Sequence, residues 1–122
     1  MPTPRSRLGL WGEELASQFL GKKGYHILAT NYRCRWGEVD IVARDGEELV
    51  FVEVRTRRST GYGAPEESLT AAKIRRLLAT CRRYLQQYSN AETGWRIDLI
   101  CIRLGPDRGL PQIDHICHAV QL

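Results

Sequence analysis

The residue pattern predicts a single α/β or α+β domain over residues 1–122, with elements in the order αβββαβ and a short last strand. Residues 36–58 alternate between apolar and polar side chains on both sides of Asp45-Gly46, which is typical of two strands joined by a tight turn. Apolar residues recur at helical spacing in one stretch before this hairpin and in one after it. With 122 residues and 43% hydrophobic composition, the chain holds enough apolar material for one core.

The first helix is expected from about Arg5 to Lys23, and Gly24 supplies its stop. Its apolar stripe is expected at Leu8, Trp11, Leu15 and Phe19. Glu13 falls at the edge of that stripe, so its carboxylate can reach the end of a sheet packed against the helix. A solvent-facing helix glutamate is the ordinary alternative.

The other elements follow from local signals. A β-prone run predicts a strand at Tyr25–Arg33, and Thr70 is a suitable N-cap for a helix at Ala71–Tyr88. Two more strands are expected at Trp95–Leu104 and Gln112–Ala119, and residues 59–68 are expected to form a loop beside the hairpin. The buried stripe of the second helix is expected at Ile74, Leu77, Leu78, Cys81, Leu85 and Tyr88.

The hairpin carries acidic side chains. Since residues at i and i+2 share a face of a strand, Glu38 and Asp40 project together, as do Glu53 and Arg55, opposite a face of valines and isoleucine. Antiparallel pairing brings Asp40 near Glu53 if the register places both toward the open end. Two crowded carboxylates repel unless a cation or proton lies between them, and such oxygen ligands suit magnesium. On spacing alone, a solvated outer face is the commoner explanation.

Basic residues outnumber acidic ones, 18 to 14, giving a net charge of +4 that is compatible with a phosphate-bearing partner. Many of the basic residues follow the hairpin or lie on the second helix. For any single one of them, an ordinary position on a solvated helix face is as common as a role in binding phosphate. The candidate nucleic-acid-binding residues are Arg57, Arg58, Lys73, Arg75, Arg76 and Arg83.

Other residues indicate structural roles. The four cysteines lack zinc-site spacing, and Cys81, Cys101 and Cys117 are expected to be buried. Asp98 is expected to pair with Arg96 or a neighbouring strand. The two C-terminal histidines, His115 and His118, share no clear face with the carboxylates. No apolar run reaches membrane-spanning length and no signal-peptide core follows the N-terminus, so a cytoplasmic location and no membrane association are expected.

Motifs over most of the chain resemble the YraN family of small bacterial proteins. They are Gly12-Glu13, Gly24-Tyr25, Asn31-Tyr32-Arg33, Gly37-Glu38-Val39-Asp40-Ile41, Phe51-Val52-Glu53-Val54-Arg55 and Arg96-Ile97-Asp98. The hairpin is also similar to the PD-(D/E)xK nuclease superfamily, which carries an Asp on one strand and Glu-x-Lys on the next. The resemblance implies a restriction-endonuclease-like core, a mixed β-sheet flanked by helices, as in archaeal Holliday junction resolvases.

The resemblance further implies a metal-dependent endonuclease acting on DNA, with branched and single-stranded DNA among the expected substrates. Asp40, Glu53 and Glu13 would hold Mg²⁺ or Mn²⁺. Arg55 stands where the superfamily has lysine, and Lys73 is the candidate substitute. Resolvase-like relatives act in pairs, so a homodimer is also expected. A nucleic-acid-binding or partner-binding module with a weak or inactive site is the alternative.

Overall fold

The described chain forms two helices and five strands in the predicted order. The computed structural model describes residues 6–58, 69–88, 94–105 and 109–122. The predicted order αβββαβ and the short last strand are confirmed, whereas the loop at 59–68 lies outside the described residues. The elements are α1 (Arg7–Lys22), β1 (His26–Cys34), β2 (Gly37–Asp45), β3 (Glu48–Arg58), α2 (Ala71–Tyr88), β4 (Trp95–Leu104) and β5 (Gln112–Ile116).

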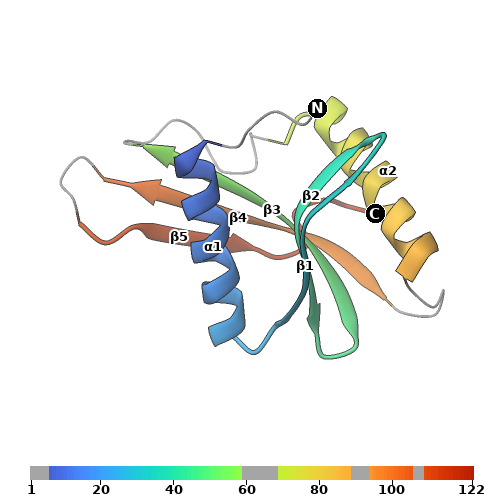
Figure 1. Ribbon diagram of the computed structural model, residues 1–122, viewed down its shortest axis with the longest axis horizontal. Helices are drawn as coiled ribbons and strands as arrows, with labels where there is room; N and C mark the ends of the chain where they lie inside the picture. The colour runs from blue at the N-terminus through green and yellow to red at the C-terminus, as the bar shows by residue number, and fades with distance from the viewer. Residues whose placement is uncertain (1–5, 59–68, 89–93, 106–108) are drawn as a thin grey trace.

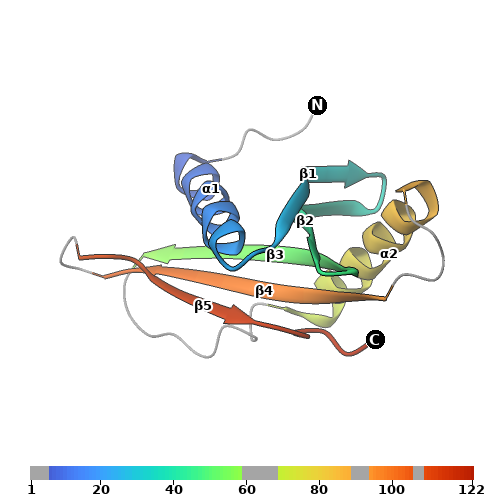
Figure 2. The ribbon, with the colours of Figure 1, turned by 90° about the horizontal axis from the view of Figure 1, so that it is seen from below.

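The strands form one mixed sheet in the order β1-β2-β3-β4-β5. Neighbouring strands are antiparallel except β3 and β4, which are parallel and are connected through α2. The two helices pack on opposite faces of the sheet (Figures 1 and 2). The fold is therefore α/β with a mixed sheet flanked by helices, consistent with the expected restriction-endonuclease-like core.

Strand β3 separates the two halves of the core. Val50, Val52 and Val54 are buried in the cluster that contains Ala16 and Leu20 of α1. Leu49 and Phe51 alternate with them and point into the cluster on the other face. That second cluster includes Leu77, Cys81 and Tyr84 of α2. Because both faces of β3 are covered by a helix in its first half, its side chains are apolar and buried from Leu49 to Val52.

Strands β1 and β2 leave the plane of the other three strands. The ladder between β2 and β3 ends at the pair Ile41–Val52, whereas β1 and β2 stay paired as far as Cys34 and Gly37. Figure 2 shows the β1–β2 pair turned out of the plane of β3, β4 and β5 on the side that carries α1. The predicted shared face of Val39 and Ile41 is therefore wrong, because Val39 packs in the α2 cluster and Ile41 in the α1 cluster.

Small residues let α1 approach the sheet closely. Gly12, Ala16 and Leu20 are its buried residues, whereas Trp11 is 40% exposed, so the predicted stripe is displaced around the helix. A Cβ atom added to Gly12 would lie 1.9 Å from Thr56 Oγ1. A glycine is required at position 12 because the backbone of α1 contacts the side chain of Thr56 on β3 there.

The predicted range of α2 is confirmed, and Thr70 Oγ1 accepts a hydrogen bond from the Lys73 backbone N–H at 3.2 Å. Its buried stripe is only partly as predicted, because Tyr88 is 66% exposed at the helix end. Strand β5 ends at Ile116 rather than Ala119, and the following Cys117 is exposed rather than buried. No described helix combines the length and apolar character needed to cross a membrane.

Candidate active site

A cleft of about 480 Å³ lies where β2 parts from β3. Beyond Val52, the edge of β3 is no longer covered by β2, and the cleft wraps around this edge. Residues of α1 line it on one face of β3 and residues of α2 line it on the other. The lining residues are Ser6, Leu8, Gly9, Glu13, Gly37, Glu38, Asp40, Glu53, Val54, Arg55, Thr56, Lys73, Arg76 and Leu77.

Asp40 takes the place of a strand partner at the start of the uncovered edge. Its Oδ2 atom accepts a hydrogen bond from the Val54 backbone N–H at 2.7 Å. The side chain is buried, with 5% of the residue exposed. This bond satisfies an amide that the departing β2 backbone leaves behind, and it fixes the orientation of the carboxylate in the cleft.

Glu53 lies beside Asp40 in the same buried corner. Burial, with a hydrogen bond to Asp40 and repulsion from its charge, raises the pKa of Glu53 to about 9, although Arg55 and Lys73 oppose the shift. The glutamate side chain is only 14% exposed. Without an added cation, the two neighbouring carboxyl groups therefore favour holding a proton between them.

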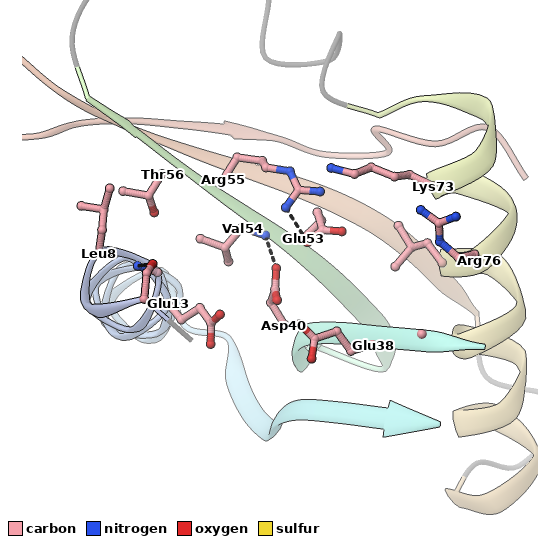
Figure 3. Close-up of a pocket in the computed structure, with 14 residues that line it drawn as sticks. Leu8, Glu13, Glu38, Asp40, Glu53, Val54, Arg55, Thr56, Lys73 and Arg76 are labelled. Atoms are coloured by element: carbon pink, nitrogen blue, oxygen red, sulfur yellow. Dashed lines mark hydrogen bonds and ion pairs between the residues drawn. The ribbon is translucent and has the colours of Figure 1, made fainter. Parts of the chain in front are cut away.

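Glu13 approaches the acidic pair from α1. Figure 3 shows Asp40 between Glu13 and Glu53. The Glu13 carboxylate reaches into the cleft from α1, which lies on the face of β3 opposite to α2. Ser6 is the N-cap of this helix, and its Oγ accepts a hydrogen bond from the Gly9 backbone N–H at 3.0 Å. This cap stabilises the first turn of α1, and Glu13 in the next turn is directed at Asp40.

Two basic side chains reach the acidic pair from the other side. Arg55 Nη1 lies 3.5 Å from Glu53 Oε1, and Arg55 Nε is buried with no hydrogen-bond partner among the described residues. Lys73, in the first turn of α2, lies close enough to Arg55 and Glu53 to interact electrostatically with both (Figure 3). Burial and the neighbouring Arg55 lower the pKa of Lys73, while Glu53 acts in the opposite direction.

The donor atoms of this corner fit a hard divalent cation. Carboxylate oxygens are the ligands that Mg²⁺ and Mn²⁺ take in proteins, and the crowding that protonates Glu53 is relieved when a cation replaces the proton. Asp40 and Glu53 are positioned to contribute together, with Glu13 facing them across the cleft. The distance of Arg55 from Glu53 is too long for a strong hydrogen bond, so Arg55 neutralises the pair only in part.

Comparison with known proteins places the chain in a family. Residues 12–102 match the model described as "Uncharacterised protein family UPF0102". The chain belongs to this family. UPF0102 proteins from Herpetosiphon aurantiacus and Roseiflexus castenholzii are 45% and 47% identical to it, covering 94% and 96% of this chain and 94% and 95% of theirs. A UPF0102 protein from Geobacter sulfurreducens is 46% identical over 94% of this chain and 89% of its own. The resemblance to the YraN family is therefore confirmed.

The basic residues of this UPF0102 chain are less concentrated than the sequence suggested. Lys73 and Arg76 line the cleft. Arg57, Arg58 and Arg75 are exposed outside its lining. Arg83 is partly buried farther along α2, where its charge acts on Tyr32 of β1. A basic path therefore extends from the cleft along α2 toward the β1–β2 hairpin.

A second polar cluster in this UPF0102 chain surrounds Asp98 on β4. Its Oδ1 accepts hydrogen bonds from Arg96 Nε at 3.0 Å and the His118 backbone N–H at 3.1 Å, and Arg96 also pairs with Glu48. Although burial opposes it, bonds from His115, Arg96 and His118 lower the pKa of Asp98. The predicted structural pairing of Asp98 with Arg96 is confirmed.

His115 joins this cluster, which the sequence did not predict. The carboxylate of Asp98, the ring of His115 and the thiol of Cys117 bring three potential metal-ligand atoms within 4.8 Å of one another. Lys23 Nζ donates to His115 Nδ1 at 2.8 Å, so the proton of this imidazole lies on Nε2, facing Asp98 Oδ2 at 2.8 Å. A protonated Nε2 has no lone pair for a metal, and the cluster is therefore a hydrogen-bonded network. Asp98 on β4 and His115 on β5 are 17 residues apart in the sequence, and no local pattern predicts their contact.

Proposed function

We propose that this protein is a metal-dependent endonuclease that hydrolyses phosphodiester bonds in DNA, with a preference set by DNA structure. The observation that carries the proposal is the buried Asp40–Glu53 pair at the uncovered edge of β3, with cationic side chains on one side of it. Two carboxylates with facing cations are the arrangement expected for binding a divalent ion together with a phosphate. The proposed place of action is the cytoplasm.

Each residue of the cleft has a separate part in this proposal. When bound, Mg²⁺ or Mn²⁺ supplies Lewis-acid chemistry to a phosphodiester and makes water a better nucleophile. Asp40 and Glu53 hold the ion, with Glu13 completing the acidic set from α1. Arg55 binds the non-bridging phosphate oxygens and stabilises the charge that develops there. Arginine does not release a proton near neutral pH, so it is not the general base.

Lys73 is the residue of the cleft best suited to handle a proton. Its ammonium group is partly buried near Arg55 and Glu53, and a lowered pKa brings it closer to the pH at which proton transfer is efficient. The PD-(D/E)xK superfamily has a lysine at the position of Arg55. In this proposal Lys73, which lies on the next element of the chain, performs the function of that lysine. The cleft then has both a phosphate-binding cation and a proton-handling one.

Metal binding is tested by calorimetry with manganese on the wild type and on Asp40→Ala, Glu53→Gln and Glu47→Gln. Glu47 is an exposed residue in the turn at the far end of the hairpin, so Glu47→Gln makes the same substitution away from the cleft. The wild type and Glu47→Gln should give equal heats, and the two cleft variants should give little heat. Equal heats for all four proteins would refute joint binding by Asp40 and Glu53.

Catalysis is tested by manganese-dependent cleavage of linear, flapped, branched and single-stranded DNA. Lys73→Ala should lower the rate by a factor of about 10² to 10⁴, the usual cost of a missing acid or base. Arg55→Lys should then lower the rate less than Lys73→Ala does, because lysine keeps the positive charge but loses the bidentate contact. If Arg55→Lys instead raises the rate and Glu53→Ala abolishes the gain, Arg55 rather than Lys73 limits the chemistry.

The alternative is a nucleic-acid-binding or partner-binding module with a weak or inactive site. The observation that favours it is Arg55, because a guanidinium can bind phosphate without transferring a proton. Binding of DNA by the wild type, with no cleavage of any of the four substrate classes, would support this alternative.

For either function we propose that two chains pair on branched DNA. Light scattering with and without a four-way junction measures the mass of the assembly.

A further inference from the structure

The tip of the β1–β2 hairpin presents an aromatic ring beside the cleft. Trp36 lies in the two-residue connection between Cys34 at the end of β1 and Gly37 at the start of β2. Its residue is 45% exposed, and the guanidinium carbon of Arg35 lies 5.3 Å from the ring centroid. The nearby Tyr32, by contrast, packs edge-on against Tyr84 with centroids 5.1 Å apart. Core packing therefore accounts for Tyr32 but leaves the exposure of Trp36 unexplained.

The turn that carries Trp36 is anchored on both sides. Arg33 Nε and Glu38 Oε2 form an ion pair across the hairpin at 2.8 Å. The Tyr32 hydroxyl donates to Gln87 Oε1 of α2 at 2.6 Å. A Cβ atom added to Gly37 would lie 3.3 Å from Thr80 Oγ1, so the backbone of the turn rests closely on α2. An anchored turn presents the ring with little loss of conformational freedom on binding.

Trp36 and the acidic pair are joined by one strand. Asp40 is four residues after Trp36 on β2, and a strand rises about 3.3 Å per residue, so the two lie roughly 13 Å apart along the strand. This span accommodates a few nucleotides of a single strand, so Trp36 and the acidic pair can contact the same strand of DNA. Arg76 lies between them, because it lines the cleft and its Cβ is 3.7 Å from the Cβ position of Gly37.

An exposed ring with the guanidinium of Arg35 beside it suits a nucleobase that is not already stacked. In a continuous duplex both faces of each base are covered by its neighbours, whereas an unpaired base offers a face to an aromatic side chain. We infer that Trp36 stacks on an unpaired base of DNA, and that Arg76 holds the phosphates between this base and the acidic pair. This inference deepens the proposed function and rests on it, because only the proposed nuclease activity places a scissile phosphate at the acidic pair. The substrate class is DNA with an unpaired base a few nucleotides from the scissile phosphate.

The inference is tested by binding without cleavage, in EDTA, so that it does not depend on nuclease activity. Fluorescence anisotropy compares a labelled oligo-dT single strand with a blunt duplex for the wild type, Trp36→Ala, Trp36→Phe and Trp11→Ala. Trp11 is the matched control, because it is 40% exposed on α1 and does not line the cleft. Trp36→Ala should weaken single-strand binding about 5- to 150-fold and leave duplex binding nearly unchanged. Trp36→Phe should keep most of the affinity, and Trp11→Ala all of it.

Two results would overturn the inference. One is equal binding of the single strand by the wild type and Trp36→Ala, and the other is an equal loss of affinity for single strand and duplex. Trp36→Leu keeps apolar volume at the turn without a π face, and it replaces Trp36→Ala if thermal unfolding shows that the alanine variant is not folded. Either negative result would leave cleavage by the wild type as a separate question, because the four substrates above test that activity directly.

Discussion

Replacing Gly12 by alanine should force α1 away from β3. The added Cβ would meet Thr56 Oγ1 at 1.9 Å and Thr56 Cβ at 3.1 Å, whereas non-bonded carbon atoms prefer about 3.5–4.0 Å. Inserting a methyl group into such a packed contact costs about 1–3 kcal/mol. Gly21 is in the same helix and an added Cβ there meets no atom within 4 Å, so Gly21→Ala reports the helix-propensity gain of up to about 1 kcal/mol by itself. Gly12→Ala should therefore be about 1–3 kcal/mol less stable than Gly21→Ala.

Urea denaturation followed by circular dichroism measures this difference by linear extrapolation. Adding Thr56→Ala to Gly12→Ala should recover part of the lost stability, because it removes the hydroxyl that the new methyl group meets. Glu13 follows Gly12, so manganese affinity should also fall in Gly12→Ala and stay unchanged in Gly21→Ala. If Gly12→Ala is as stable as Gly21→Ala and shows no coupling to Thr56→Ala, the close approach of α1 and β3 is not as described.

Three more predictions concern charge. Because the pKa of Glu53 is raised to about 9 in the folded protein, the fold binds more protons than the unfolded chain between the ordinary carboxyl range and pH 9. The metal-free protein should therefore lose stability as pH rises through that window, by at most about 1.4 kcal/mol per pH unit from this group, and Glu53→Gln should flatten the urea-derived profile. Arg96→Leu should cost about 3–5 kcal/mol in urea denaturation because it leaves buried Asp98 without its main cation, and adding Asp98→Leu should restore much of the stability. Reversing the charges of exposed Arg75 and Arg76 should weaken DNA binding equally for all sequences and reduce the slope of log affinity against log salt by about 0.9 for each phosphate that is no longer neutralised; an unchanged slope would argue against an electrostatic interface.

The elements that the sequence predicts well depend on local chemistry. The bounds of α2 follow from the Thr70 cap and the apolar spacing after it, and those of β4 follow from alternation after Gly94. Local pattern is less informative where packing decides which side is buried. The apolar character of Trp11 predicts a core position, but small residues bring the backbone of α1 closer to β3, and Trp11 lies partly outside.

The sequence predicts the pair of carboxylates in the candidate site, but it does not predict the cleft that surrounds them. The alternation of the hairpin places Asp40 and Glu53 at its open end, whereas the departure of β2 from β3 depends on how β1, β2 and α2 pack together. That departure decides that α1 and α2 line the same cleft from opposite faces of β3. Likewise, His115 cannot be assigned to Asp98 from sequence, because the contact depends on the register between β4 and β5.

The hydrogen bond from Val54 to Asp40 makes ligand binding and fraying of the sheet linked equilibria. The carboxylate that faces the cleft also holds the amide at the end of the β2–β3 ladder. A ligand that draws Oδ2 away must compete with this amide, and so it opens the sheet locally, whereas a ligand bound through the other oxygen leaves the amide protected. The hydrogen-exchange rate of the single Val54 amide therefore distinguishes these two binding modes at the junction of β2 and β3.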